Sequence, residues 1–392
     1  MNQNGLSAAV RARLKHYPAP HAAHFGVVPA PPTRGAVRIG GPETGQRVAE
    51  ADRALARLST QTRAGSAFAL TRILERQEAV SSSSIEGTNS TLDALLELEE
   101  DGDGDEDAKE TRGVTLALDH GLAEIRDRRH DAFEVPMVLE LHRRLAADMA
   151  GFRGTPGVLR TEVVWIGGHG RDPSTSTWNP PPPDDVPACI EDNMAYMRAE
   201  PEDISQIAVI VRAAVAHAHF EAVHPFQDGN GRIGRLMLPL AFAADGHAPL
   251  YLSPWIEAHK TDYYEALKSA QQRLDHGPII DLLARAVIGT EQEFNATVAA
   301  VDAVEEEWRT RFRLRRNSTA ERALHLLKAY PVLRARTLAD RLGVSFKAAS
   351  DGLSRLEVLG VVEEKTGYAR NRIFVATRLL RILSRPFGAT PD

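Results

Sequence analysis

Hydrophobic residues recur three and four positions apart along most of this chain, which is the spacing of an amphipathic α-helix. The first such stretch covers residues 47–98 and places Ala54, Leu55 and Leu58 on one face. Further helical stretches are predicted at residues 111–155, 192–199, 204–221, 236–244 and 279–315. The pattern therefore predicts a mainly α-helical protein.

Two of these helices are apolar on nearly every side. Residues 204–221 carry a stripe of Ile207, Val211 and Val215, and the other positions are also largely apolar. A helix of this composition is buried on most sides. Residues 236–244 have the same character. The polar, glycine-rich segment between the two joins buried helices, which favours a functional site over a purely structural turn.

Two regions depart from the helical pattern. Residues 1–46 are rich in proline, histidine and glycine, which predicts an extended arm that includes one short helix. Residues 157–166 predict a strand, followed by a glycine turn and by the stiff prolines at 180–183. Together they predict a small β-hairpin flap. The residues assigned to the flap are Trp165, Ile166, Gly167 and Gly168.

The C-terminal part has its own pattern. Ser318 and Glu321 form a helix-capping signature, and three short helices are predicted at residues 321–328, 337–342 and 345–359. Two strands at 361–364 and 372–375 complete the element order of a winged helix-turn-helix. Its local basic residues are Arg334, Arg336, Arg341, Lys347, Arg355, Arg370 and Arg372. Arg336, Lys347 and Arg370 are candidates for DNA contact, and a protein-docking or structural role is the alternative.

Length and these patterns divide the chain. A sequence of 392 residues is too long for one ordinary domain. The predicted parts are an arm at 1–46, a helical region at 47–115, a helical core at 116–290, a helical linker at 291–317 and the winged helix at 318–392.

Composition narrows the function classes. The net charge of −6 gives no overall basic field, so nucleic-acid binding would depend on a local patch. The single cysteine, Cys189, excludes an intrachain disulfide framework, fits a reducing compartment and is interpreted as inert. The N-terminal residues lack a secretory signal, and no run approaches the ~20 apolar residues of a membrane span. We expect a cytoplasmic protein without a membrane partner.

Residues 224–235 concentrate the candidate chemistry. His224 can act as a base near neutral pH, and Asp228 is a hard oxygen ligand suited to Mg²⁺. The intervening glycines let backbone N–H groups approach an anion, and Asn230 is a good helix N-cap. Arg232 and Arg235 lie three apart on the helix that follows and can grip phosphate. These are the parts of a site for a polyphosphate and its metal.

Three other motifs fail on inspection. Residues 40–45 resemble the start of a P-loop, but Gln46 stands where lysine is needed. The acidic segment at 99–110 resembles a calcium loop, but Glu106 stands where glycine is needed. His217 and His224 are separated by about 10.5 Å of helix rise, too far for one zinc ion.

The segment around four consecutive serines, Ser81 to Ser84, lies inside a helical stretch and leads to Gly87, a plausible helix stop. Taken alone, it is best interpreted as a helix end with a solvated Glu86. Tyr263 and Tyr264 stand together in a helical stretch, where adjacent tyrosines usually place one ring inside and one outside; a stacking role in a pocket is the alternative.

At this point the sequence resembles a known family. Residues 224–235 match every defined position of the Fic signature, HPFx(D/E)GNGRxxR. Ser82, Glu86 and Gly87 fit the inhibitory motif (S/T)xxxE(G/N), placed N-terminal to the core as in the class whose inhibitory helix precedes the Fic fold. The flap and the tyrosine pair also have counterparts in the family. The resemblance covers residues 50–290, and an appended winged helix is frequent among relatives.

The resemblance implies a helical Fic core and protein AMPylation, in which AMP passes from MgATP to a Ser, Thr or Tyr hydroxyl of a target protein or of the protein itself. It assigns His224 as the base, Asp228 as the Mg²⁺ ligand and Glu86 as an inhibitor that pairs with Arg235. Nucleotide binding is assigned to Gly229, Asn230, Gly231, Arg232, Ile233, Gly234, Arg235, Tyr263, Tyr264 and Gln271. A homodimer is the expected assembly.

Two positions refine this expectation. Gln271 replaces the asparagine that some relatives place near adenine, so base preference is less secure than the phosphate chemistry. Gly231 stands where the phosphotransferring Doc branch has lysine, which favours nucleotidyl transfer. The alternatives are a nucleotide-sensing transcriptional regulator and an enzyme that removes AMP from a modified target.

Overall fold

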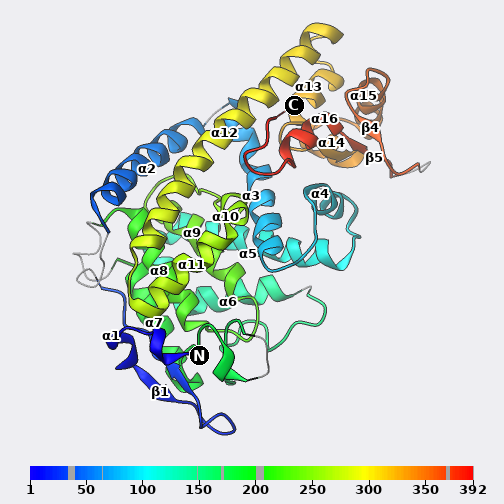
Figure 1. Ribbon diagram of the computed structural model, residues 1–392. Helices are drawn as coiled ribbons and strands as arrows, with labels where there is room; N and C mark the ends of the chain where they lie inside the picture. The colour runs from blue at the N-terminus through cyan, green and yellow to red at the C-terminus, as the bar shows by residue number, and fades with distance from the viewer. Residues whose placement is uncertain are drawn as a thin grey trace. The chain divides into compact units, whose positions relative to one another are not determined.

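The computed structural model describes residues 1–33, 40–63, 65–147, 149–168, 172–199, 207–367 and 371–391. It is mainly helical, as predicted (Figure 1). Contacts divide it into two compact units, Met1–Leu58 with Gly113–Thr290, and Ser59–Arg112 with Glu291–Asp392. Among the described residues, no helix is both long enough and apolar enough to span a bilayer.

The first unit contains most of the helices. Its elements are α1 (Ala8–Arg11), β1 (Leu14–His16), β2 (Phe25–Val27), most of α2 (Pro42–Gln61), most of α5 (Glu106–Arg128), α6 (Val135–Ala146), α7 (Val186–Met197), α8 (Val209–Val223), α9 (Asn230–Ala244), α10 (Ser253–Ala258), α11 (Lys260–Arg273) and the start of α12 (Gly277–Phe312). Short 3₁₀ helices lie at Gln3–Gly5, Arg129–Ala132, Pro173–Thr175 and Pro183–Asp185.

Helix α8 is the centre of this unit. Every one of its residues is buried, as its apolar sequence predicts. It packs against α7, α9 and α11, which lie next to it in Figure 1. The predicted helix at 204–221 begins at Val209, and residues 204–206 lie outside the described part of the chain. The C-terminal end of α8 and the N-terminal end of α9 enclose the glycine-rich loop.

The prediction of an extended N-terminal arm is wrong. Besides α1, the arm contains an antiparallel β-hairpin in which Leu14 pairs with Val27. Tyr17 is buried and its hydroxyl donates to the Pro180 carbonyl at 2.7 Å. A Cβ on Gly26 would lie 2.3 Å from the same carbonyl oxygen, so only glycine allows this approach. The hairpin is also bonded to the segment before the prolines, because the Val27 N–H donates to the Asn179 carbonyl at 3.0 Å.

The predicted strand at 157–166 is also wrong as a strand, although the flap it was to build is present in reduced form. Only Ile166 forms a β-bridge, antiparallel to Trp178. The turn between them includes Gly167 and Gly168, both with positive φ. The segment cannot extend its pairing because the backbone N–H of Arg160 donates to the Pro225 carbonyl instead of to a neighbouring strand. His169 and Gly170, which follow in the sequence, lie outside the described residues.

The second unit joins sequences that are far apart. Its elements are α3 (Gly65–Ile85), α4 (Leu92–Asp101), the end of α12, α13 (Thr319–Leu326), β3 (Val332–Arg334), α14 (Ala335–Leu342), α15 (Phe346–Val358), β4 (Glu363–Glu364), β5 (Ile373–Val375) and α16 (Thr377–Leu383). The sheet order is β3-β5-β4, with both pairs antiparallel. The strand β3 was not predicted, because only Val332–Arg334 forms it.

This unit corrects two predicted domain boundaries. Leu70 and Ile73 of α3 share one hydrophobic core with Trp308 of α12 and with Leu353 of α15. The predicted region at 47–115 is therefore divided between the two units, and the predicted linker at 291–317 is largely the continuation of α12. The physical reason is that α3 and α4 bury their apolar faces against the C-terminal helices.

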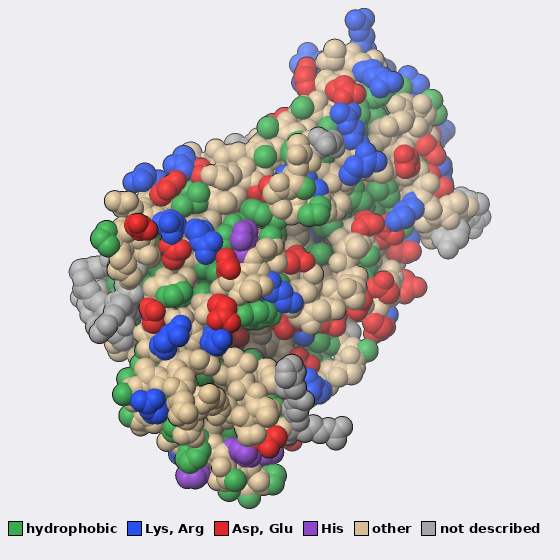
Figure 2. All heavy atoms as spheres, in the orientation of Figure 1, with side chains coloured by type: hydrophobic (Ala, Val, Ile, Leu, Met, Phe, Trp, Pro, Cys, Tyr) green, Lys and Arg blue, Asp and Glu red, His purple; other side chains and the backbone are tan. Residues whose placement is uncertain are grey.

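Acidic side chains gather beside this core. The acidic loop predicted at 99–110 is mostly helical, because α4 continues to Asp101 and α5 starts at Glu106. Figure 2 shows the cluster of Asp and Glu side chains at the edge of the molecule where α4 and the start of α5 lie. Within the unit, Glu97 pairs with Lys365, and Asp101 pairs with Arg334.

Candidate functional site

His224 ends α8 in a conformation unlike that of the helix. Its φ of 50° and ψ of 64° are left-handed, which is uncommon for a residue with a side chain. Its N–H still donates to the Phe220 carbonyl at 2.9 Å. Strained residues of this kind cluster at functional sites. The chain therefore leaves a buried helix at the residue predicted to be the base, whose side chain is partly exposed.

The loop after His224 is closed by Asn230. The Asn230 side chain accepts from the Phe226 N–H at 2.8 Å and donates to the Phe226 carbonyl at 2.9 Å. The predicted N-cap role of Asn230 is wrong: α9 begins at Asn230, and the N-cap is Gly229. Gly229 has a φ of 78°, which favours glycine. The Asn230 side-chain amide therefore closes the loop. Its backbone forms the first residue of α9.

The first two turns of α9 hold two buried guanidiniums. Arg232 is 3% exposed and Arg235 is 1% exposed. A Cβ on Gly234 would lie 2.4 Å from a carboxylate oxygen of Glu221, so glycine lets α8 and α9 pack closely here. Ile233 is fully buried, while Gly231 stays partly exposed. Two cations near the positive end of a helix form an environment that favours a polyanion.

Asp228 meets the requirements of a magnesium ligand. Its Oδ1 accepts from the Gly229 N–H at 2.7 Å and lies 3.7 Å from Arg232 Nη2. Its side chain is 29% exposed, so the carboxylate is reachable. Mg²⁺ is commonly bound through one or two carboxylates together with substrate phosphates and water. A single oriented carboxylate beside an anion site fits that pattern.

His142 supports the loop from α6 and was missed in the sequence. Its Nδ1 accepts from the Gly157 N–H at 2.9 Å, which places the proton on Nε2, and Nε2 donates to the Asp228 carbonyl at 3.1 Å. The ring stacks on Phe226 with centroids 3.6 Å apart. Burial lowers the pKa of His142 to about 4. A polar residue on the apolar face of a predicted helix was the signal that could have identified it.

Arg160 is the second missed residue. It is 5% exposed, and its guanidinium donates to the carbonyls of His224 at 2.8 Å, Pro181 at 2.7 Å and Glu162 at 3.0 Å. One side chain thus ties the end of α8 to the flap segment. Burial lowers the pKa of Arg160 to about 10. Its signal in the sequence was a charged residue within a segment predicted to be a strand.

The two tyrosines of α11 divide as adjacent residues usually do. Tyr263 is 1% exposed and Tyr264 is 44% exposed. The Tyr263 hydroxyl donates to His217 Nε2 at 2.8 Å, and His217 Nδ1 donates to the Gly234 carbonyl at 3.0 Å. Burial lowers the pKa of His217 to about 4. Tyr263 and His217 therefore form a buried hydrogen-bonded chain to the Gly234 carbonyl of α9, and His217 is a core histidine.

Gln271 and the flap residues are the remaining predicted site residues of the first unit. Gln271 lies on α11, is 9% exposed, and lines a cavity with His219. Trp165 and Ile166 are partly exposed and precede the glycine turn. The Ile166 N–H donates to the Trp178 carbonyl at 2.9 Å. Cys189 is buried, and burial raises the pKa of its thiol to about 11, in line with the inert interpretation.

The predicted inhibitory residues belong to the second unit. The four serines are helical and α3 ends at Ile85, with Gly87 following at a φ of 101°. Ser82 is 1% exposed, whereas Glu86 is exposed. Glu86 and Arg235 lie in different units, so their pairing stays a prediction.

The residues predicted to contact DNA also belong to this unit. Arg336 lies on α14 and Lys347 on α15, and both are exposed. Arg370 lies outside the described residues. Of the other basic residues, Arg334 pairs with Asp101, and Arg372 pairs with Glu357. The basic surface is therefore narrower than the sequence predicted.

Comparisons with known proteins fit this geometry. The family model described as the Fic/DOC family matches residues 132–241, and the one described as the Fic/DOC family N-terminal matches residues 46–123. The chain is 28% identical over 205 residues to the protein adenylyltransferase Fic of Drosophila erecta, covering 51% of this chain and 38% of that protein. It is 30% identical over 161 residues to the protein adenylyltransferase fic-1 of Caenorhabditis elegans, covering 41% of this chain and 28% of that protein. The chain thus spans well under half the length of these two relatives.

Solved structures give the same fold. The Caenorhabditis elegans Fic-1 structure matches with a TM-score of 0.51 at 22% identity, covering 66% of this chain and 74% of that one. A Fic family protein from Desulfovibrio desulfuricans matches with a TM-score of 0.52 at 19% identity, covering 89% of this chain and 98% of that one.

Proposed function

The chain belongs to the Fic/DOC family, and on that basis we propose that it is a protein adenylyltransferase. The substrate is ATP, and the acceptor is a Ser, Thr or Tyr hydroxyl of a target protein or of this protein itself. The acceptor oxygen bonds to the α-phosphorus of ATP, the bond from that phosphorus to the bridging oxygen breaks, and pyrophosphate leaves. His224 takes the proton of the hydroxyl.

The observation that carries this proposal is the junction of α8 and α9. It brings a partly exposed His224 to a loop whose next helix starts with two buried arginines. The backbone of Gly229, Asn230 and Gly231 and the side chain of Arg232 are suited to hold phosphates, with Arg235 at the γ-phosphate. Asp228 would hold Mg²⁺, which offsets negative charge on the phosphates. His142 and Arg160 keep the loop in position.

Labelling with ATP radioactive at the α-phosphate tests the proposal. Purified wild-type protein should label itself weakly, and His224→Ala should reduce labelling by about 10²–10⁴-fold, the usual contribution of a general base. His16→Ala, an exposed histidine on β1, is the matched control and should label like the wild type. Labelling that persists in His224→Ala would overturn the assignment of the base.

We also propose that Glu86 inhibits the site by pairing with Arg235. Support comes from the position of Glu86, exposed one residue beyond the end of α3, with Gly87 stopping the helix. A carboxylate bonded to the arginine that should bind the γ-phosphate competes with the nucleotide. Glu86→Gly should label more strongly than the wild type. Glu43→Gly, at an exposed position in the first turn of α2, is the control, and equal labelling in all three proteins would refute the inhibitory role.

A second function is favoured by the element order of residues 318–392, which supports a winged helix-turn-helix. Arg336 and Lys347 are exposed on α14 and α15, so DNA contact is a specific expectation. However, α15 also carries Asp351 and Glu357, which reduces its net positive charge. A gel shift on the protein's own promoter region should show salt-sensitive binding that Arg336→Ala with Lys347→Ala weakens. Absence of such binding would leave a structural or protein-docking role.

Two expectations from the sequence stay open to direct measurement. Removal of AMP from a modified target would be seen by incubating an AMPylated protein with the wild type and with Glu86→Gly. Loss of the label in the wild type alone would favour the reverse reaction. A homodimer would be seen by analytical ultracentrifugation of the full chain.

A further inference from the structure

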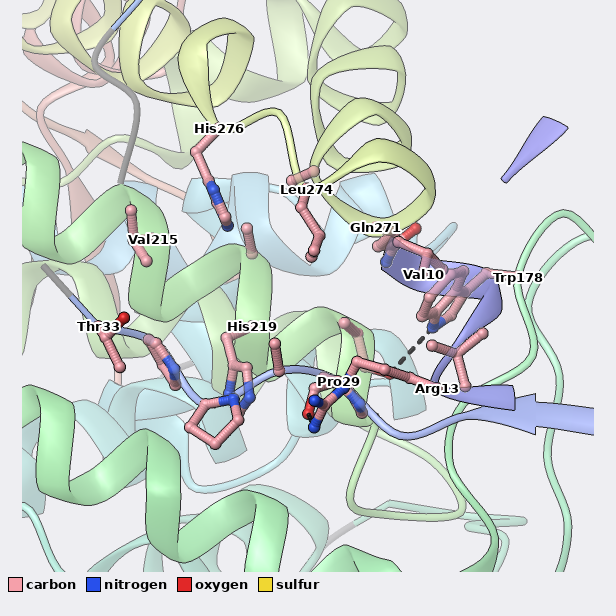
Figure 3. Close-up of a pocket in the computed structure, with 17 residues that line it drawn as sticks. Val10, Arg13, Pro29, Thr33, Trp178, Val215, His219, Gln271, Leu274 and His276 are labelled. Carbon is pink, nitrogen blue, oxygen red and sulfur yellow. Dashed lines mark hydrogen bonds between the residues drawn. The ribbon is translucent and has the colours of Figure 1, made fainter. Parts of the chain in front are cut away.

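A cavity lies along the C-terminal half of α8, inside the first unit (Figure 3). Its walls come from the N-terminal arm, from α8 and from α11. Figure 3 shows His276 and Leu274 reaching in from one side, with His219 and Val215 on the α8 side. The cavity measures about 60 Å³, which corresponds to roughly four to six water molecules. Any occupant must therefore be small.

His219 presents a hydrogen-bond donor in this cavity. The Asn193 Nδ2 group donates to the Ala216 carbonyl at 2.8 Å and lies 3.1 Å from His219 Nδ1. A carbonyl can only accept, so the Asn193 orientation is fixed and His219 Nδ1 is the acceptor of its second proton. The His219 proton is therefore on Nε2. His219 is 6% exposed, and within the described part of the chain Nε2 has no hydrogen-bond partner.

Two further groups give the cavity its charge and polarity. His276 Nδ1 is also buried without a partner among the described residues. Arg13 lines the wall, and its guanidinium donates to the carbonyls of Val28 at 2.7 Å and Pro29 at 2.9 Å. Burial lowers the pKa of His219 to about 3 and also lowers the pKa of His276, so both rings are neutral near neutral pH and the positive charge on this wall belongs to Arg13. The imidazole of His219 is thus neutral and the fixed charge facing it is positive.

Most of the remaining lining is apolar. Val10, Val27, Val215, Ala218 and Leu274 all contribute side chains. Buried polar groups in proteins are normally bonded to protein or to water, and an aliphatic lining gives water few partners. A ligand that matches this wall has a short aliphatic body and an anionic acceptor group.

We propose that this cavity is an effector site for a small aliphatic monocarboxylate, with one carboxylate oxygen accepting from His219 Nε2–H and the aliphatic part lying against Val215 and Leu274. Arg13 supplies the compensating charge. The second oxygen accepts from His276 when that ring carries its proton on Nδ1. This site is separate from the phosphate-binding loop.

Three residues of the cavity wall are connected to parts of the proposed active site. A bound ligand can therefore affect that site. Ala222 lines the cavity and lies two residues before His224. Trp178, which bridges to Ile166 of the flap, donates its indole N–H to the Ala222 carbonyl at 2.9 Å, the dashed line in Figure 3. Gln271, the predicted adenine neighbour, lines the same wall. Filling the cavity therefore bears on the end of α8, the flap and α11 together.

Binding is tested with isobutyrate, using NMR of the full chain labelled with ¹⁵N at histidine. Isobutyrate should shift the His219 ring signals at millimolar concentration. His219→Phe keeps the size of the ring, removes the donor, and should weaken binding by about 10- to 100-fold, since hydrogen bonds to charged groups are worth 1.5–3 kcal/mol. Thr33→Trp, at the exposed rim, should block entry without disturbing the core, and Thr33→Ala should not.

The outcomes separate binding from regulation. Unchanged His219 signals with isobutyrate, or binding that His219→Phe leaves intact, would overturn the site. Preference for the neutral amide isobutyramide over isobutyrate would overturn the carboxylate assignment. The effector role rests on the proposed adenylyltransferase activity: isobutyrate should change the labelling rate of Glu86→Gly but not of Glu86→Gly with His219→Phe. Binding without a change in labelling overturns the effector role alone, whereas absence of any labelling would bear on the proposed function and leave the binding result intact.

Discussion

The loop after His224 and the helix that ends before Glu86 are both visible as short motifs, yet they are held in place in different ways. The loop is closed by Asn230 on Phe226, four residues away. The helix α3 is held by a core whose other members include Trp308 and Leu353, more than 200 residues later in the chain. Local hydrogen bonding defines the loop, and long-range apolar packing defines the helix.

Because of this packing, the proposed inhibitory residue Glu86 belongs to the same unit as the C-terminal helices. Gln77 of α3 bonds to the Leu383 carbonyl, and Arg72 lies over the Tyr330 ring at 4.5 Å. A sequence motif for an inhibitory helix suggests an accessory of the catalytic part. The packing instead makes α3 part of the unit that contains residues 318–392.

The largest effect is expected from a substitution that creates a cavity in the core shared by α3 and the C-terminal helices. Ile73 is fully buried, so Ile73→Ala should lower the free energy of unfolding by about 2–5 kcal/mol. Because the core is shared, amide hydrogen exchange should accelerate in α13 to α16 as well as in α3. Phe68→Ala on the same helix, where the ring is 62% exposed, should change stability by less than about 0.5 kcal/mol. Faster exchange in α3 alone would contradict the conclusion that α3 and the C-terminal helices unfold as one unit.

A second test concerns pH and the supports of the loop. The pKa of His142 is about 4 in the folded protein against 6.5 without burial. As pH falls, the unfolded chain takes up this proton first, so stability is complete above pH 6.5 and is lost as the pH falls from 6.5 toward 4. One such histidine accounts for roughly 3 kcal/mol at the acid end, at ~1.4 kcal/mol for each unit of pKa difference.

Urea denaturation of the wild type and of His142→Gln across this range measures the effect. The variant should lose stability less steeply as the pH falls, while His217 and His219 keep part of the slope because their pKa values are lowered as well. His16→Gln, at an exposed position on β1, should retain the full slope. Parallel curves for the wild type and His142→Gln would contradict the buried, neutral state of His142.

Prediction from the sequence succeeded where the deciding interaction was local. The apolar stripe of α8 and the stop at Gly87 depend on residues within a few positions of each other, and both were predicted correctly. The role of Asn230 was wrong because an N-cap and a loop closure use the same side chain, and only the distance to Phe226 decides between them. Arg160, His142 and the folded arm each depend on a carbonyl far away in the sequence, those of Pro181, Asp228 and Pro180 at separations of 21, 86 and 163 residues, which no short pattern reveals.

The smallest effect is expected at a purely local feature of the second unit. Ser318 was predicted as a helix cap, and its hydroxyl accepts from the Glu321 N–H at 3.2 Å, while the Glu321 carboxylate accepts from the Asn317 N–H at 2.5 Å. Ser318→Ala should cost about 1 kcal/mol of the local stability of α13, measured by amide exchange in that helix, and Ser318→Asp should restore most of it, because aspartate caps equally well. Unlike Ile73→Ala, the loss should leave hydrogen exchange in α3 unchanged, since the cap contacts only its own helix. Accelerated exchange in α3 would mean that even this local element is coupled to the shared core, and the contrast between local and long-range stabilisation would then fail within the second unit.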